Sequence, residues 1–278
     1  MSNLECIPIK LNYNRIINQE EKNNNKNSSK INSSKHIILF IIFINSFIFS
    51  ESNPRNILSK ISEITLKING TGDINIFGDD FNFREYEVYI NGNLQNISKN
   101  IYYFENKTNY IKIIFKDVIS TTNCMFGSCY NIIEIDLSNF NTSEVVEMAK
   151  MFYGCSSLIS LNLSNFDTSK VTFMDSMFEG CSSLISIDLS NFDTSKTTLT
   201  YNMFSGCSSL ISLDLSNFNT FKVQIMSNMF SECISLVSLD FSNFDISTAT
   251  NIGSIFSKCE KLKYINLKNG NMKSNYLE

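Results

Sequence analysis

Apolar and polar positions recur at a fixed interval of 26 residues from Met125 towards the C-terminus. Each unit carries a Met-Phe or Ile-Phe pair, at Met125-Phe126, Met151-Phe152, Met177-Phe178, Met203-Phe204, Met229-Phe230 and Ile255-Phe256. Cysteine follows each phenylalanine by three residues, at Cys129, Cys155, Cys181, Cys207, Cys233 and Cys259. Self-similarity at one period indicates a stack of repeated units, in which neighbouring units bury a continuous core between them.

Every unit contains one segment that predicts a strand and one that predicts a helix. In Ser186-Ile187-Asp188-Leu189-Ser190 apolar side chains alternate with small polar ones, as in a strand with one buried side. After a turn, Asp193-Thr194 could begin a helix by accepting hydrogen bonds from free backbone N–H groups. In the second unit, apolar residues at helical spacing follow the equivalent turn, at Val171, Met174, Met177 and Phe178. Glycine comes next, where helices often end in a left-handed residue, at Gly154, Gly180 and Gly206.

The unit Met-Phe-x-Gly-Cys-Ser-Ser-Leu-x-Ser-Leu-x-Leu-Ser-Asn-Phe-Asp-Thr-Ser resembles the BspA-like family of leucine-rich-repeat surface proteins. The resemblance extends from Met125 to about Asn271. It implies a secreted or surface-attached protein with a role in adhesion. Together with the strand and helix patterns, it predicts an α/β fold, a right-handed leucine-rich-repeat solenoid with parallel strands on one face and short helices on the other. The last unit departs from the pattern, with Ile255 in place of Met and Lys268-Asn269-Gly270 in place of Ser-Asn-Phe, as in a terminal cap.

The N-terminal part of the chain differs in composition from the repeats. Met1 to Lys35 is polar, and the apolar run Ile37 to Phe49 is shorter than the roughly 20 residues that span a bilayer. Its length and the basic residues before it fit a signal peptide, with Ser50 and Ser52 as small residues at a cleavage site. An uncleaved anchor and a buried core segment are the alternatives. The predicted divisions are a polar segment 1–36, a signal peptide or signal anchor 37–52, a small β-rich region 53–123, a repeat region 124–271 and a tail 272–278.

The β-rich region is predicted from period-two alternation and turn residues. Ile64–Ile68 and Tyr110–Phe115 have strand patterns, and Glu87–Ile90 precedes Asn91-Gly92, a dipeptide favoured in tight hairpins. This region could close the exposed first repeat, as a solenoid requires. Three Asn-x-Ser/Thr sequons are candidate glycosylation sites in an exported protein, at Asn69, Asn96 and Asn106.

Eight cysteines raise the question of metal or disulfide chemistry. One cysteine per unit gives a line rather than the close pairs of a metal site, so the sequence predicts neither a metal nor a cofactor. Buried thiols that pack as small apolar groups explain the line. Disulfides between neighbouring units, or between Cys124 and Cys129, remain alternatives.

The outward positions of the predicted strands form the candidate binding face. Its residues are Asp136, Ser160, Asn162, Ser186, Asp188, Ser212, Asp214, Ser238, Asp240 and Asn266. Three interpretations are open: a solvated surface, a broad surface for a ligand, or a Ca²⁺ site made by stacked carboxylates. A second polar ladder follows the strands, and hydrogen bonding to the backbone at the turns explains it: Asn139, Asn165, Asn191, Asn217, Asn243 and Asn269.

Net charge and the types of side chain in the repeats limit the possible functions. The formal net charge is −4, which gives no basic footprint for nucleic acid. The only histidine, His36, precedes the apolar run, so the repeats offer no histidine base, and we expect no enzyme. The prediction is an extracellular or cell-surface protein that binds a protein or glycan on another cell or matrix, with membrane contact only through an uncleaved apolar segment. The alternatives are an intracellular scaffold and, less favoured, a calcium-binding surface or a surface-polymer hydrolase that uses Asp188 or Asp214.

Overall fold

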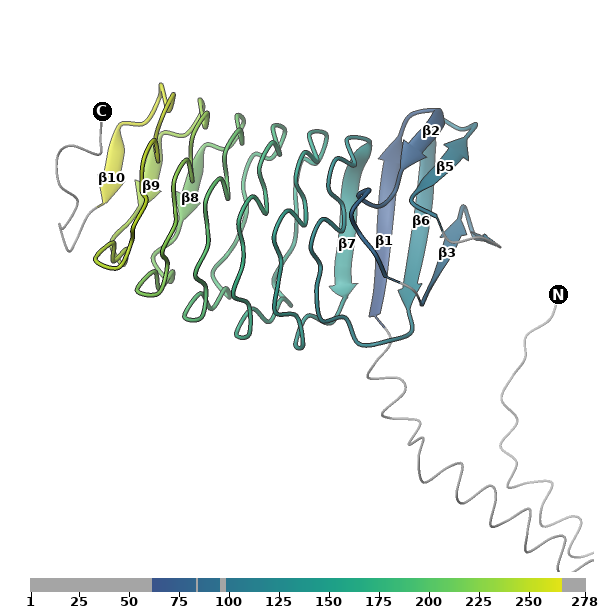
Figure 1. Ribbon diagram of the computed structural model, residues 1–278. Coiled ribbons are helices and arrows are strands. Elements are labelled where there is room, and N and C mark those ends of the chain that lie inside the picture. Colours follow the sequence, from purple (N-terminus) through teal and green to yellow (C-terminus); the bar gives the residue numbers. More distant parts are fainter. Residues whose placement is uncertain (1–61, 84, 96–98, 267–278) are drawn as a thin grey trace, which may run out of the picture. The chain divides into compact units, whose positions relative to one another are not determined.

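Stacked 26-residue units make up most of the chain that the computed structural model describes, which is residues 62–83, 85–95 and 99–266 (Figure 1). These residues belong to the unit Lys60–Glu278. Parallel backbone bridges join equivalent positions of successive units, from Thr121 to Glu147, Phe173, Leu199, Ile225 and Asn251. The predicted segments 1–36, 37–52 and 272–278, with Cys6, His36 and Asn96, lie outside the described residues.

Three short strands form a parallel sheet towards the C-terminal end of the stack. They are β8 (Ser212–Asp214), β9 (Ser238–Asp240) and β10 (Tyr264–Asn266), in the order β10-β9-β8. Their register is one unit per strand, so that Leu213 lies opposite Leu239, and Leu239 opposite Ile265. Equivalent side chains of successive units are therefore neighbours on this face.

An antiparallel sheet lies at the other end of the stack. Its order is β4-β3-β6-β1-β7, with β1 (Ser62–Asn69), β3 (Tyr86–Ile90), β4 (Asn93–Leu94), β6 (Thr108–Phe115) and β7 (Ile132–Asn139). A separate antiparallel pair joins β2 (Gly72–Asn75) and β5 (Ile101–Phe104). Because β1 pairs with β7, the strand of the first unit is not left as an open edge on that side. The tight hairpin predicted at Asn91-Gly92 is confirmed, since Ile90 pairs with Asn93 across it.

The predicted fold class is wrong. The residues that the structure describes contain ten strands and no helix, and most of the strand pairs are antiparallel. An α/β leucine-rich-repeat solenoid with short helices opposite its strands is therefore not the fold of the described residues.

Hydrogen bonds between units explain why the expected helix is absent. In the segment that was expected to be helical, Met174, Ser176 and Phe178 donate their backbone N–H groups to carbonyls of the following unit over 2.9–3.1 Å. An α-helix would need those donors for its own i−4 carbonyls. Ser176 also has a φ of 55°, and Gly180 one of 73°. Left-handed residues do not fit inside a right-handed helix, so the segment runs as a series of turns.

The expected helix start is a turn of a different kind. The Oδ1 atom of Asp193 accepts the backbone N–H of Ser195 over 2.9 Å, as an N-cap would, but the chain then turns towards the neighbouring unit. Thr194 bonds to the backbone of the next unit rather than to a helix of its own. The side chains thus satisfy local donors without beginning a helix.

Ladders of identical apolar side chains form the core of the stack. The rings of Phe126, Phe152, Phe178, Phe204, Phe230 and Phe256 stack with centroids 5.5–5.9 Å apart. Phe77 continues this ladder into the β-rich region, 6.2 Å from Phe126. Because each ring contacts the rings above and below it, packing in one unit depends on its neighbours.

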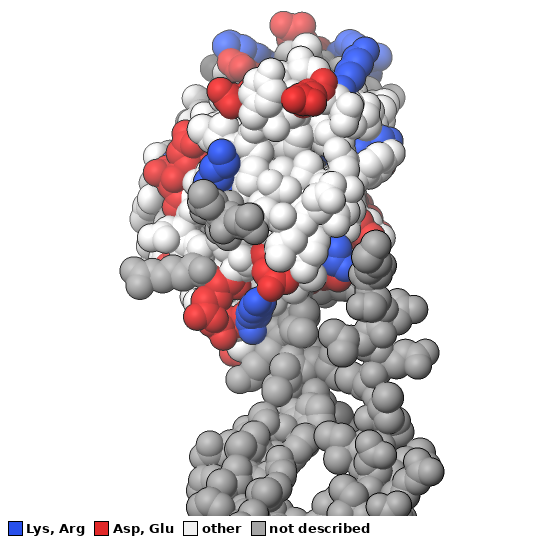
Figure 2. All heavy atoms as spheres, turned by 90° about the vertical axis from the view of Figure 1, so that its right-hand side faces the viewer, with Lys and Arg blue, Asp and Glu red and all other residues white. Residues whose placement is uncertain are grey.

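Figure 2 shows the described chain from the end that carries the antiparallel sheet. Acidic and basic side chains are interspersed there around uncharged residues. On the face shown, the described residues present no continuous basic area of the kind that holds a phosphate backbone.

Candidate binding face

The predicted face is a regular set of outward side chains. Eight of its ten residues are exposed, and Ser238 and Asp240 are half-buried. In β8, Leu213 points into the core at 4% exposure, while Ser212 and Asp214 on either side are exposed. The alternation of the strand therefore brings the hydroxyls and carboxylates of successive units to one side, as predicted.

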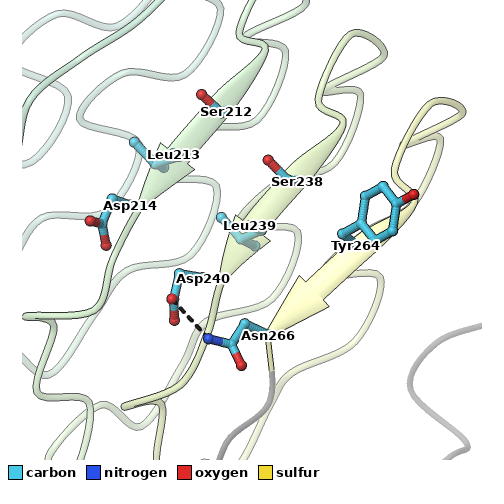
Figure 3. A pocket seen from close by; sticks show the side chains of 8 residues that line it. All are labelled: Ser212, Leu213, Asp214, Ser238, Leu239, Asp240, Tyr264 and Asn266. Carbon is cyan, nitrogen blue, oxygen red and sulfur yellow. Dashed lines mark hydrogen bonds between the residues drawn. The ribbon is translucent and has the colours of Figure 1, made fainter.

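A groove of about 380 Å³ lies across β8, β9 and β10 (Figure 3). It is lined by Ser212, Leu213, Asp214, Ser238, Leu239, Asp240, Tyr264 and Asn266. One polar row runs from Ser212 through Ser238 to Tyr264, and a second runs from Asp214 through Asp240 to Asn266. A smaller hollow of about 90 Å³ continues one unit earlier, beside Asp188.

Five acidic or amide positions of the predicted face have a structural role as well. One side-chain oxygen accepts the backbone N–H two residues later over 2.8–3.0 Å, in the pairs Asp136–Ser138, Asn162–Ser164, Asp188–Ser190, Asp214–Ser216 and Asp240–Ser242. The bond from Ser190 N–H, with one from its hydroxyl, lowers the pKa of Asp188. The same two groups of Ser138 lower the pKa of Asp136. These carboxylates are therefore held in one orientation before any ligand arrives.

Four members of the asparagine ladder donate to backbone carbonyls, as predicted: Asn165, Asn191, Asn217 and Asn243. Asn269 lies outside the described residues. The Nδ2 group of Asn191 donates to Leu163 O and Phe166 O of the preceding unit, at 3.0 and 2.8 Å. Asn217 repeats these contacts one unit later. The amides fasten the turns of adjacent units and are not part of the groove.

Threonines form a structural ladder that the sequence analysis missed. Thr194 Oγ1 donates to Asn219 O over 3.1 Å and accepts Asn219 N–H over 2.7 Å. The same two-way contact recurs at Thr142, Thr168 and Thr220, and all four threonines are buried. The recurrence of Thr after Asp or Asn was the available signal, but a helix start explained it equally well.

Comparison with known proteins places the chain in a family. A family model described as "Mycoplasma protein of unknown function, DUF285" matches residues 93–210, 120–233 and 184–275 in overlapping stretches. The chain belongs to this family. The curated proteins and the solved structures gave no match. Membership of DUF285 assigns no activity, and the BspA-like resemblance stays a prediction.

The cysteines of this DUF285 chain line the core. All seven in the described part are free, including Cys124 and Cys129. Cys181 Sγ donates to Phe152 O of the preceding unit over 3.2 Å, and burial raises its pKa to about 12. The contact repeats at Cys155, Cys207, Cys233 and Cys259. These thiols are packed and hydrogen-bonded rather than reactive.

The remaining predicted features of the DUF285 chain lie away from the groove. Asn69 ends β1, where its Oδ1 accepts Thr108 Oγ1–H over 2.9 Å, and Asn106 is exposed between β5 and β6. Within the described ranges, no group of three or more His, Cys, Asp or Glu could hold a metal ion. The same ranges contain no helix of the length and apolarity that a bilayer span requires.

Proposed function

We propose that this protein binds other macromolecules at the cell surface or outside the cell, in adhesion to host or neighbouring cells, through the candidate binding face. The observation that carries the proposal is the groove on β8, β9 and β10. Five of its eight lining residues belong to the predicted face: Ser212, Asp214, Ser238, Asp240 and Asn266.

The geometry suits a long ligand better than a small one. Ser212 and Asp214 of β8 recur as Ser238 and Asp240 of β9. Neighbouring strands lie about 4.8 Å apart, so a polymer lying across them could meet the same contacts repeatedly. Open, repeated surfaces of this kind gain affinity by adding many modest contacts. Carboxylates that are already fixed by the bonds to Ser190 and Ser216 lose little further freedom on binding.

Export is supported by the sequence before the described residues. Positive charge, an apolar run and small residues follow one another from Lys35 to Ser52, which is the order of a signal peptide or signal anchor. Either form would carry the repeats across a membrane.

An intracellular scaffold is the second candidate. It is favoured by the seven free thiols of the described residues, because cysteines of exported proteins often become oxidised. Full burial from Cys155 to Cys207 also keeps these thiols from oxidants, so the observation fits an exported protein as well.

Localisation of the full chain separates the two candidates. Intact cells that produce the protein with a C-terminal tag are treated with a protease that cannot enter, and the culture medium is assayed in parallel. We expect the tag in the medium or in a protease-sensitive form, and purified chain should adhere to cells. A protected, cytosolic tag would contradict the proposal and support the scaffold.

A further inference from the structure

Tyr264 changes the chemistry of the groove at its last strand. It occupies the position of β10 that Ser212 and Ser238 hold in β8 and β9. Its side chain is 68% exposed, and the ring stands at the end of the serine row (Figure 3). An exposed aromatic ring beside fixed polar groups is a common composition of binding sites, because the ring supplies apolar contact and the polar groups supply orientation.

The polar groups around the ring suit hydroxyl groups. Ser212 and Ser238 can each donate and accept a hydrogen bond, as a sugar hydroxyl does. Asn266 Nδ2 donates to Asp240 Oδ2 over 2.9 Å, which directs the carbonyl oxygen of Asn266 elsewhere. Asp214 uses Oδ1 to accept Ser216 N–H, and among the described residues nothing donates to its Oδ2. These atoms could accept hydrogen bonds from a ligand.

The spacing of the strands also fits a carbohydrate chain. Successive strands are about 4.8 Å apart, which is close to the length of one sugar unit in an extended glycan. A glycan that crossed β10, β9 and β8 would place one ring on Tyr264 and later units beside Asp240 and Asp214.

We propose that the groove on β8, β9 and β10 binds a neutral glycan chain. The ring of Tyr264 stacks on one sugar of that chain, and oxygen atoms of Asp214 and Asn266 accept hydrogen bonds from hydroxyl groups along the chain. This inference rests on the proposed function and names the ligand class of the same face. A basic peptide is the competing occupant, because the groove contains two carboxylates. The glycan is favoured because both oxygens of Asp240 already accept hydrogen bonds, from Ser242 and Asn266, and because the Tyr264 ring offers a flat apolar surface.

Calorimetric titration of the full chain tests the inference with four neutral probes, namely the hexasaccharides of cellulose, chitin, laminarin and amylose. At least one should bind. Tyr264→Ala should weaken that binding by about tenfold or more, and Tyr264→Phe should retain it, because stacking needs the ring and not the hydroxyl. Tyr103→Ala is the matched control, since Tyr103 is also 68% exposed but lies on β5, and it should change nothing.

Removal of the negative charge of Asp214 distinguishes glycan binding from binding of a basic peptide. Asp214→Asn keeps one oxygen for Ser216 N–H but replaces the second acceptor with an amide donor, so glycan affinity should fall by the value of one hydrogen bond, about tenfold or less. Binding of a decalysine peptide that Asp214→Asn abolishes, with none of the four hexasaccharides bound, would overturn the inference. Failure of all four hexasaccharides alone would also overturn it. In either case adhesion of the wild-type chain to cells would leave the proposed function intact, whereas loss of that adhesion would remove both.

Discussion

The Nδ2 atom of Asn266 lies 2.9 Å from Oδ2 of Asp240, one unit earlier in the chain. This hydrogen bond joins the last two strands of the groove along the row that Asp214, Asp240 and Asn266 form. It also shows how the repeat produces a site: the same position of successive units carries Asp and then Asn, and their side chains meet only because β9 and β10 pair in register.

Burial predicts that buried and exposed positions in β8 and just before it respond differently to substitution. Leu210 is fully buried, so Leu210→Asp should lower the free energy of unfolding by about 3–5 kcal/mol, the usual cost of an unpaired buried charge. Asp214→Ser on the exposed side should cost about 0.5 kcal/mol. Urea unfolding measures both, and equal losses would show that the assignment of the two sides is wrong.

The threonine ladder predicts that one buried hydroxyl stabilises two units. Thr194→Val keeps the shape of the side chain but removes both contacts with Asn219, so we expect a loss of about 1–3 kcal/mol in the free energy of unfolding. Thr250→Val is the control, because the exposed Thr250 hydroxyl donates only to Gln224 O and water can replace that bond. The ladder would have no structural role if the two variants melted alike.

The buried thiols predict a loss of stability at high pH. Burial raises the pKa of Cys181 to about 12 from the ordinary value of 9.0, so the folded chain holds this proton more tightly than the unfolded chain. Its contribution is complete below the unfolded pKa and decreases as pH rises towards the folded one. Urea unfolding from about pH 8 to about pH 10.5 should show a shallower decline for Cys181→Ala than for wild type. Parallel declines would contradict the burial of this thiol.

The carboxylates of the face predict the opposite dependence at low pH. Hydrogen bonds from Ser190 lower the pKa of Asp188 below 3.8, so its contribution is present above that value and is lost as pH falls through the folded pKa. Asp188→Asn keeps an acceptor for Ser190 N–H and cannot titrate. Between about pH 5 and about pH 2 the variant should therefore lose less stability than wild type in thermal unfolding. A larger loss in the variant would argue against the bond.

The sequence predicted the period and the buried and exposed positions of the repeat, because stacked ladders require the same residue type in every unit. It was wrong in predicting a strand in every unit, since the segment Ser186–Ser190 is not a strand. Phe178, Cys181 and Leu184 are buried and Asp188 is exposed, as expected. The helix was wrong because apolar residues at i, i+3 and i+6 also fit successive turns. Only the backbone hydrogen bonds from Met174 and Ser176 to the next unit distinguish a series of turns from a helix. These bonds join residues 25 apart in the sequence, so a local pattern does not reveal them.

The groove itself was predicted only in part. Ser212, Asp214 and Asp240 follow the repeat and could be found by their period. Tyr264 departs from it, so a search for recurring residues passes over the one aromatic ring that lines the groove. Departures from a repeat are therefore where a ligand site is best sought in such a chain.

Binding to cells by a variant with a blocked groove most directly tests whether this face carries the function. Ser212→Arg would place a large side chain in the groove, and Gln224→Arg would place the same side chain at an exposed position of the same unit outside it. Both variants should fold, because both positions are exposed. With the amount of purified full chain bound to intact cells as the readout, we predict that Ser212→Arg loses most of the binding and Gln224→Arg keeps it. Equal binding by the two variants would contradict the assignment of function to this face.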